Sequence, residues 1–74
     1  MASAFGRWIS AIRDGLQAMQ ARGELPPEAD VARLACALMA AVEGGLLLAK
    51  AQRDVAPLEA ALDTVIDHIA SLAA

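Results

Sequence analysis

The segment from about residue 31 to residue 53 most constrains how this chain can fold. It is the longest apolar stretch of the sequence, and its Ala, Leu, Met and Gly residues predict one long helix. Apolar residues fall on its main stripe and also on the reverse face, with few charges before its end. A helix that is apolar on both sides must be covered on both sides. Since the rest of the chain is short, we expect a second subunit to cover one of these faces.

Two further helices are predicted, one on each side of this segment. Apolar residues recur there every three or four positions, and no alternating strand pattern is present. Gly23 and the following pair of prolines end the first helix, Asp30 suits the N-cap of the second, and Pro57 suits the first turn of the third. We therefore predict an all-α fold in which residues 1–74 form a single helical domain. Its three antiparallel-packed helices are expected at about 4–22, 31–53 and 57–73.

Length and composition exclude several classes of protein. A chain of 74 residues is too short for two domains, and an apolar content of 58% argues against disorder. A single cysteine forms no disulfide within the chain and suits a reducing, cytoplasmic location. The net charge of −3 and the scarcity of aromatic residues argue against direct contact with nucleic acid. Arg33 and Glu43 lie inside the apolar segment and argue against a membrane span. A core this small is marginal by itself, which again favours association.

No catalytic, metal or cofactor site is expected from the sequence. Cys36 and His68 are predicted on different helices, without a third orienting group or an oxyanion hole, so we expect no enzymatic activity. One His and one Cys are too few donors for a metal ion. We expect Cys36 to be a small buried apolar side chain and His68 to be solvated or at the edge of the core. Gly44-Gly45 lacks the Lys-Ser/Thr of a phosphate-binding loop and suits a close helix crossing instead.

An ordered set of short motifs runs along nearly the whole chain. They are Ala21-Arg22-Gly23-Glu24-Leu25 with the prolines after it, the Asp30 cap, Glu43-Gly44-Gly45-Leu46-Leu47-Leu48, Arg53-Asp54 and the leucine-containing helix from Pro57. Each motif alone is common in helical proteins. Together and in this order they resemble the C-terminal regulatory domain of TetR-family transcriptional repressors.

This resemblance implies a fold and a function. In that family an N-terminal helix-turn-helix domain binds operator DNA, whereas the C-terminal part binds a small effector and dimerises. The last two helices of each subunit usually pair with their partners as an intermolecular four-helix bundle. The chain looks like the final three helices, without the DNA-binding domain and most of the effector pocket. We thus expect a homodimer that contributes to binding a small apolar effector, in a parent that represses transcription in response to that ligand.

The residues expected to carry this function form two groups. At the dimer interface we expect residues of the second and third helices: Ala40, Gly44, Leu47, Leu48, Leu58, Leu62, Val65 and Ile69. Facing the interior and the effector we expect residues of the first two helices: Trp8, Ile12, Leu16, Met39 and Val42. An alternative from another functional class is a stand-alone helical adaptor that binds an amphipathic helix of a partner protein in an apolar groove.

Overall fold

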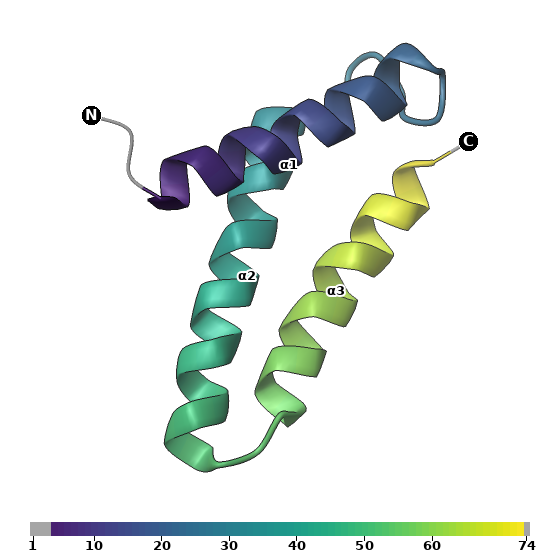
Figure 1. Cartoon of the computed structure of the whole chain (residues 1–74). Coiled ribbons are helices and arrows are strands. Elements are labelled where there is room, and N and C mark those ends of the chain that lie inside the picture. The colour runs from purple at the N-terminus through teal and green to yellow at the C-terminus, as the bar shows by residue number, and fades with distance from the viewer. Residues whose placement is uncertain (1–3, 74) are drawn as a thin grey trace.

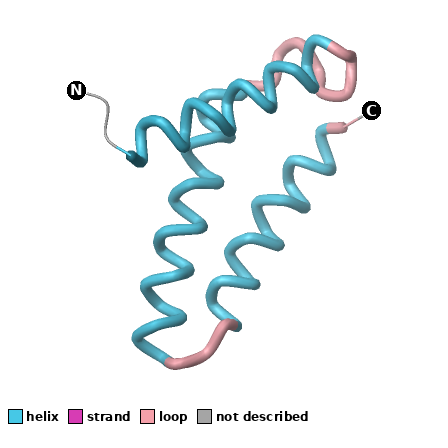
Figure 2. Tube along the Cα trace, viewed as in Figure 1, coloured by secondary structure: helices cyan, strands magenta, loops and turns pink. Residues whose placement is uncertain are grey.

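The computed structural model describes residues 4–73, and they form three α-helices joined by two short loops (Figures 1 and 2). The helices are α1 (Ala4–Ala21), α2 (Val31–Gln52) and α3 (Ala56–Leu72). Every helix end lies within one residue of the range expected from the sequence, and residues 4–73 contain no strand. The prediction of an all-α fold is therefore confirmed.

Local hydrogen bonds and backbone geometry define where the helices begin and end. Gly23 follows α1 with a φ of 79°, a left-handed conformation that glycine adopts without strain. The Asp30 carboxylate accepts a backbone N–H of the first turn of α2 at 3.1 Å, as an N-cap does. At the other end of α2, Arg53 takes the left-handed conformation with a φ of 52°. The Asp54 carboxylate then accepts the first backbone N–H of α3 at 2.9 Å. Both loops are thus fixed by specific contacts.

The core lies where α1 crosses the first half of α2 (Figure 1). α2 packs against both other helices, whereas α1 and α3 have no Cα atoms within 8 Å of each other in the described chain. Leu25, in the loop between α1 and α2, is only 2% exposed and closes the core from the side. The buried apolar residues are Leu16, Leu25, Val31, Leu34, Ala35 and Met39.

A glycine sets the distance between α2 and α3, which run antiparallel as a hairpin (Figure 1). A Cβ atom at Gly45 would lie 2.9 Å from both the Cα and the Cδ1 of Leu58, closer than real Cβ contacts. At the neighbouring Gly44, no atom lies within 4 Å of the Cβ position, and this residue is exposed. The close crossing expected at Gly44-Gly45 is therefore made by Gly45 within the chain, whereas Gly44 faces outward.

The described molecule is a thin plate with Cα extents of 40 × 33 × 13 Å. Two stacked layers of helices need about 13–15 Å between their outermost Cα atoms, given interaxial distances of 8–10 Å and a Cα radius of about 2.3 Å. The smallest extent of 13 Å thus matches two layers, with α1 in one and the α2–α3 hairpin in the other. In residues 4–73 the opposite side carries no helix, and no residue of α3 is fully buried. We refer to this side, away from α1, as the outer face of the hairpin.

Candidate functional site: an uncovered helical face and an adjoining pocket

Apolar side chains of α2 are exposed away from α1. Leu47 is 69% exposed and Leu48 is 50% exposed, and small residues such as Ala40 and Gly44 lie beside them on the surface. In the described chain, one copy therefore leaves part of the circumference of α2 uncovered. Neighbouring exposed leucines on a helix are typical of an interaction surface.

The eight residues expected at a dimer interface differ in burial according to their helix. Those of α2 are exposed: Ala40, Gly44, Leu47 and Leu48. Those of α3 are half-buried: Leu58, Leu62, Val65 and Ile69. Leu58 packs on Gly45 of its own chain, so part of the α3 stripe is already used inside the subunit.

The five residues expected to face the effector are also spread over different environments. Leu16 and Met39 are buried, and Ile12 and Val42 are half-buried. Trp8, which was expected to face the interior, is 54% exposed. Its ring meets Phe5 edge to face, with ring centroids 6.1 Å apart. None of these five residues lines the pocket described next.

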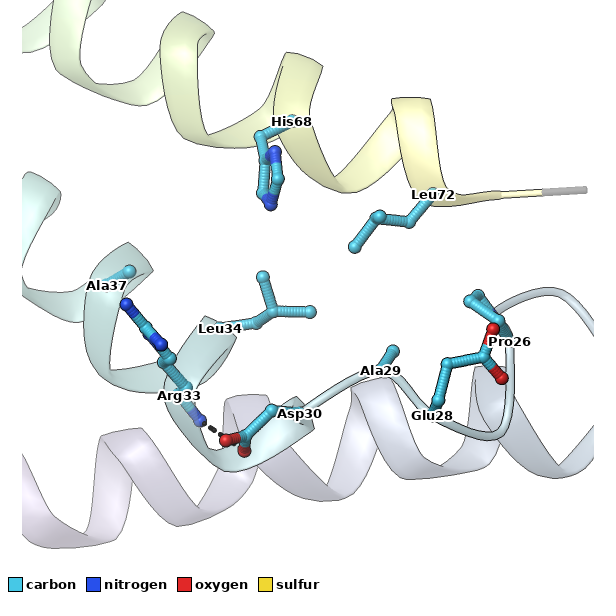
Figure 3. Close-up of a pocket in the computed structure, with 9 residues that line it drawn as sticks. All are labelled: Pro26, Glu28, Ala29, Asp30, Arg33, Leu34, Ala37, His68 and Leu72. Carbon is cyan, nitrogen blue, oxygen red and sulfur yellow. Dashed lines mark hydrogen bonds between the residues drawn. The ribbon is translucent and has the colours of Figure 1, made fainter.

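A pocket of about 460 Å³ opens between the start of α2, the loop before it and the end of α3 (Figure 3). Leu34 and Leu72 point toward each other across it, and His68 points into it from α3 (Figure 3). No residue of α1 lines the pocket. Its lining consists of Pro26, Glu28, Ala29, Asp30, Arg33, Leu34, Ala37, His68 and Leu72. Sequence reasoning missed this pocket because its walls come from segments far apart in the chain.

The polar groups in this region do not form a catalytic or metal site. Among residues 4–73, no group of three or more His, Cys, Asp or Glu side chains could hold a metal ion. Asp30 already caps α2, and Cys36 does not line the pocket that His68 lines. Cys36 is exposed on α2, so the expectation that it is buried is wrong. It faces away from the core because the buried stripe of α2 passes through its neighbour Ala35.

One wall of the pocket is held in place by Gln20, near the end of α1. Its Nε2 donates to the carbonyl oxygens of Pro26 (2.9 Å), Pro27 (3.1 Å) and Ala29 (3.1 Å). An amide nitrogen has two hydrogens, so the three acceptors share them. Sequence reasoning missed Gln20 because a glutamine near the end of an amphipathic helix has no distinctive pattern.

Replacing Gln20 by Glu should destabilise the fold, because a carboxylate would face three carbonyl oxygens without a hydrogen to donate. Leaving hydrogen-bonding groups unpaired in this way costs about 1–3 kcal/mol, which we expect in the free energy of unfolding measured by urea titration. Gln17→Glu is the matched control, since Gln17 is exposed on the same helix. Its effect should stay within about 0.5 kcal/mol. Equal effects of the two variants would contradict this role of Gln20.

An ion pair lies next to the same loop, outside the pocket. The Arg22 Nε donates a hydrogen bond to Oε2 of Glu24. This bond lowers the pKa of the Glu24 carboxyl and raises the pKa of Arg22. Both side chains are exposed, and exposed ion pairs contribute little to stability.

Among the described helices, α2 is long and apolar enough to cross a membrane, judged by length and composition only. Central helices of soluble proteins commonly meet the same criterion, so this is weak evidence for a membrane span. Arg33 and Glu43 lie within the helix, and burying their charges in lipid would be costly.

The comparison with protein families decides what kind of domain this is. A TetR-family model that describes the C-terminal domain of LmrA/YxaF-like transcriptional regulators matches residues 1–64. The chain belongs to this family. The resemblance seen in the sequence motifs is thereby confirmed. Searches of curated proteins and of solved structures gave no match.

Membership of the LmrA/YxaF-like family defines the general role of the domain. It is a regulatory domain of a transcription regulator. Domains of the TetR family are not enzymes, and they commonly form homodimers and bind small-molecule effectors. The regulators themselves are cytoplasmic proteins.

Proposed function

We propose that this LmrA/YxaF-like domain is the dimerisation module, and one part of the effector-binding unit, of a cytoplasmic TetR-type repressor. The observation that supports this best is the uncovered apolar surface of α2, on which Leu47 and Leu48 are 69% and 50% exposed. A second copy would remove these leucines from water. It would also enlarge a core that is marginal in a single chain of 74 residues.

In this proposal, residues 1–74 act as one helical domain that holds two subunits together. The outer residues of α2, Ala40, Gly44, Leu47 and Leu48, contact the partner first. The α3 residues Leu58, Leu62, Val65 and Ile69 complete an intermolecular four-helix bundle. In this proposal the helix-turn-helix domains of the parent contact the DNA. This domain is acidic, with a net charge of −3, and acidic surfaces do not favour contact with the DNA backbone.

The effector, a small apolar molecule, binds in this proposal beside α1 and the half of α2 that α1 crosses. Ile12, Leu16, Met39 and Val42 form the apolar lining there, and Trp8 lies at its exposed edge. Binding favours one separation of the two DNA-binding domains over another, and the dimer provides the fixed centre of that change. The effector thereby controls whether the parent stays on its operator.

Sedimentation equilibrium tests the dimer directly. We expect the purified chain to sediment as a dimer at micromolar concentration, because burying the exposed leucines stabilises the pair. Circular dichroism at the same concentrations should show a helical protein whose melting temperature rises with concentration, as mass action requires. A folded monomer whose melting temperature is independent of concentration would overturn the proposal.

The alternative of a stand-alone adaptor rests on the same exposed surface, so it needs a separate readout. An adaptor keeps its groove open for a partner helix, and a fluorescent apolar dye should then bind it strongly. A dimer covers the surface, and dye fluorescence should stay low until dilution separates the subunits. Strong dye binding by a monomer would favour the adaptor.

A further inference from the structure

The pocket between the start of α2 and the end of α3 is built from residues that the proposed function does not use. None of the residues assigned above to the dimer interface or to the effector lines it. Its volume of about 460 Å³ falls within the range of small-molecule sites in proteins. Such sites combine a mostly apolar wall with a few polar groups that fix the orientation of the ligand. The pocket therefore has the size of a second, separate ligand site.

The apolar wall of this pocket comes from α2, α3 and the loop before α2. Leu34 is buried, Leu72 is half-buried, and the two side chains point toward each other (Figure 3). Ala37 extends the wall along α2, and Pro26 and Ala29 extend it along the loop. A hydrocarbon chain or ring that lies here removes apolar side chains from water, which favours binding. The wall thus fits the apolar body of a ligand.

Most hydrogen-bond acceptors around the pocket already have partners. The carbonyl oxygens of Pro26 and Ala29 accept from Gln20, and the Asp30 carboxylate caps α2. Within residues 4–73, the Glu28 carboxylate makes no hydrogen bond or ion pair. It lies at the opposite end of the pocket from Arg33 (Figure 3). The end near Arg33 therefore offers a ligand donors rather than acceptors.

Two donor side chains at that end have no partner. Arg33 lies along the α2 wall, and His68 points into the pocket from α3 (Figure 3). Within residues 4–73, neither side chain makes a hydrogen bond or an ion pair. A guanidinium group presents its N–H donors as a fork that fits a carboxylate, and an imidazole ring adds another donor. Arg33 also lies in the first turn of α2, where the helix dipole favours an anion.

We propose that this pocket binds a small amphipathic carboxylate, separately from the effector. The carboxylate of the ligand accepts hydrogen bonds from Arg33 and His68, and its apolar body lies between Leu34 and Leu72. Glu28 at the other end repels a second anionic group, so the ligand carries one carboxylate and an uncharged tail. All of these residues belong to one subunit, so the site does not depend on dimerisation.

Titration of the isotope-labelled chain with simple probes, followed by NMR, tests the ligand class. We expect octanoate to give saturable shifts of the backbone signals of Ala29, Arg33 and His68. Octanol lacks the charge, octylamine carries the opposite charge and acetate lacks the apolar tail. Each should bind about fivefold more weakly or worse, since an exposed charge pair contributes up to about fivefold in affinity. Equal binding of octanol or octylamine would overturn the proposal, and so would shifts confined to Leu47 and Leu48.

Substitutions in matched pairs test the residues. Arg33→Gln should weaken octanoate binding about fivefold and leave octanol binding unchanged. Arg7→Gln is its control, because Arg7 is exposed on α1, outside the pocket, and its loss changes the net charge equally. Glu28→Gln should strengthen octanoate binding about twofold, whereas Glu59→Gln, at an exposed position on α3, should not. Circular dichroism verifies that each variant is helical. Equal effects within either pair would overturn the assignment of the site.

The outcomes separate this site from the dimerisation proposed above. A monomer that binds octanoate in the pocket would support the site while overturning dimerisation. A dimer whose pocket signals show no saturable shift up to about 10 mM octanoate would overturn the site and leave dimerisation standing.

Discussion

A leucine in place of Gly44 should weaken the dimer about tenfold to a hundredfold without unfolding the subunit. Within the chain, the Cβ position of Gly44 meets no atom within 4 Å, so the larger side chain fits the isolated subunit. In the proposed dimer, this position contacts the partner subunit. Forcing extra atoms into such a contact typically costs about 1–3 kcal/mol, and about 1.4 kcal/mol corresponds to a tenfold change in affinity. Sedimentation equilibrium over a dilution series measures the change.

Gly44→Ala provides the matched control for this prediction. It adds one methyl group and should raise helix propensity by up to about 1 kcal/mol, with little effect on association. Circular dichroism should show helical protein for both variants. If Gly44→Leu dimerises as tightly as the unaltered chain, Gly44 does not lie at the interface, and the proposed function loses its central contact.

Alanine at the next residue, Gly45, should have the opposite consequence and destabilise the subunit itself. The new Cβ would lie 2.9 Å from the Cα of Leu58, and a backbone atom cannot move away cheaply. Such overpacking costs about 1–3 kcal/mol. The gain in helix propensity of up to about 1 kcal/mol offsets only part of this cost. We expect a net loss of up to about 2 kcal/mol in the free energy of unfolding.

Urea unfolding of Gly44→Ala and Gly45→Ala at one protein concentration is the decisive comparison. Fixing the concentration matters because dimerisation contributes to apparent stability. The two variants carry the same chemical change one residue apart, so differences in intrinsic helix propensity cancel. The gap should therefore equal the overpacking cost of about 1–3 kcal/mol, with Gly45→Ala the less stable. Similar stabilities would mean that α3 does not approach α2 at Gly45 as the structure indicates.

Periodicity and helix-end chemistry in the sequence were enough to predict the helices. The signals that end or begin a helix are local, because each affects the backbone only within a few residues of its own position. They are the Asp30 cap, the double proline and the break that contains Asp54. The helix bounds therefore match within one residue, and the all-α fold and the family were both reached without coordinates. The uneven covering of α2 was also visible, because too many of its apolar residues lie off a single stripe.

The environment of individual residues was harder to predict. Cys36 was expected among buried residues and is exposed, and the same holds for Trp8. Both lie on amphipathic or apolar helices. The sequence there indicates an apolar side chain, but it does not show whether a neighbouring helix extends far enough to cover it. The first turns of α1 project beyond α2 in Figure 1, so an aromatic side chain there remains in water.

The sequence by itself determined where this LmrA/YxaF-like domain is helical, which family it belongs to and that its central helix has more apolar surface than one chain covers. Only the tertiary structure decided that Gly45 faces α3 while Gly44 faces outward, and that a pocket opens between the start of α2 and the end of α3. The physical reason is the distance along the chain over which the interactions act. Helix formation depends on residues within one or two turns, whereas two adjacent residues point about 100° apart. Which of them meets another helix is set by how distant segments pack.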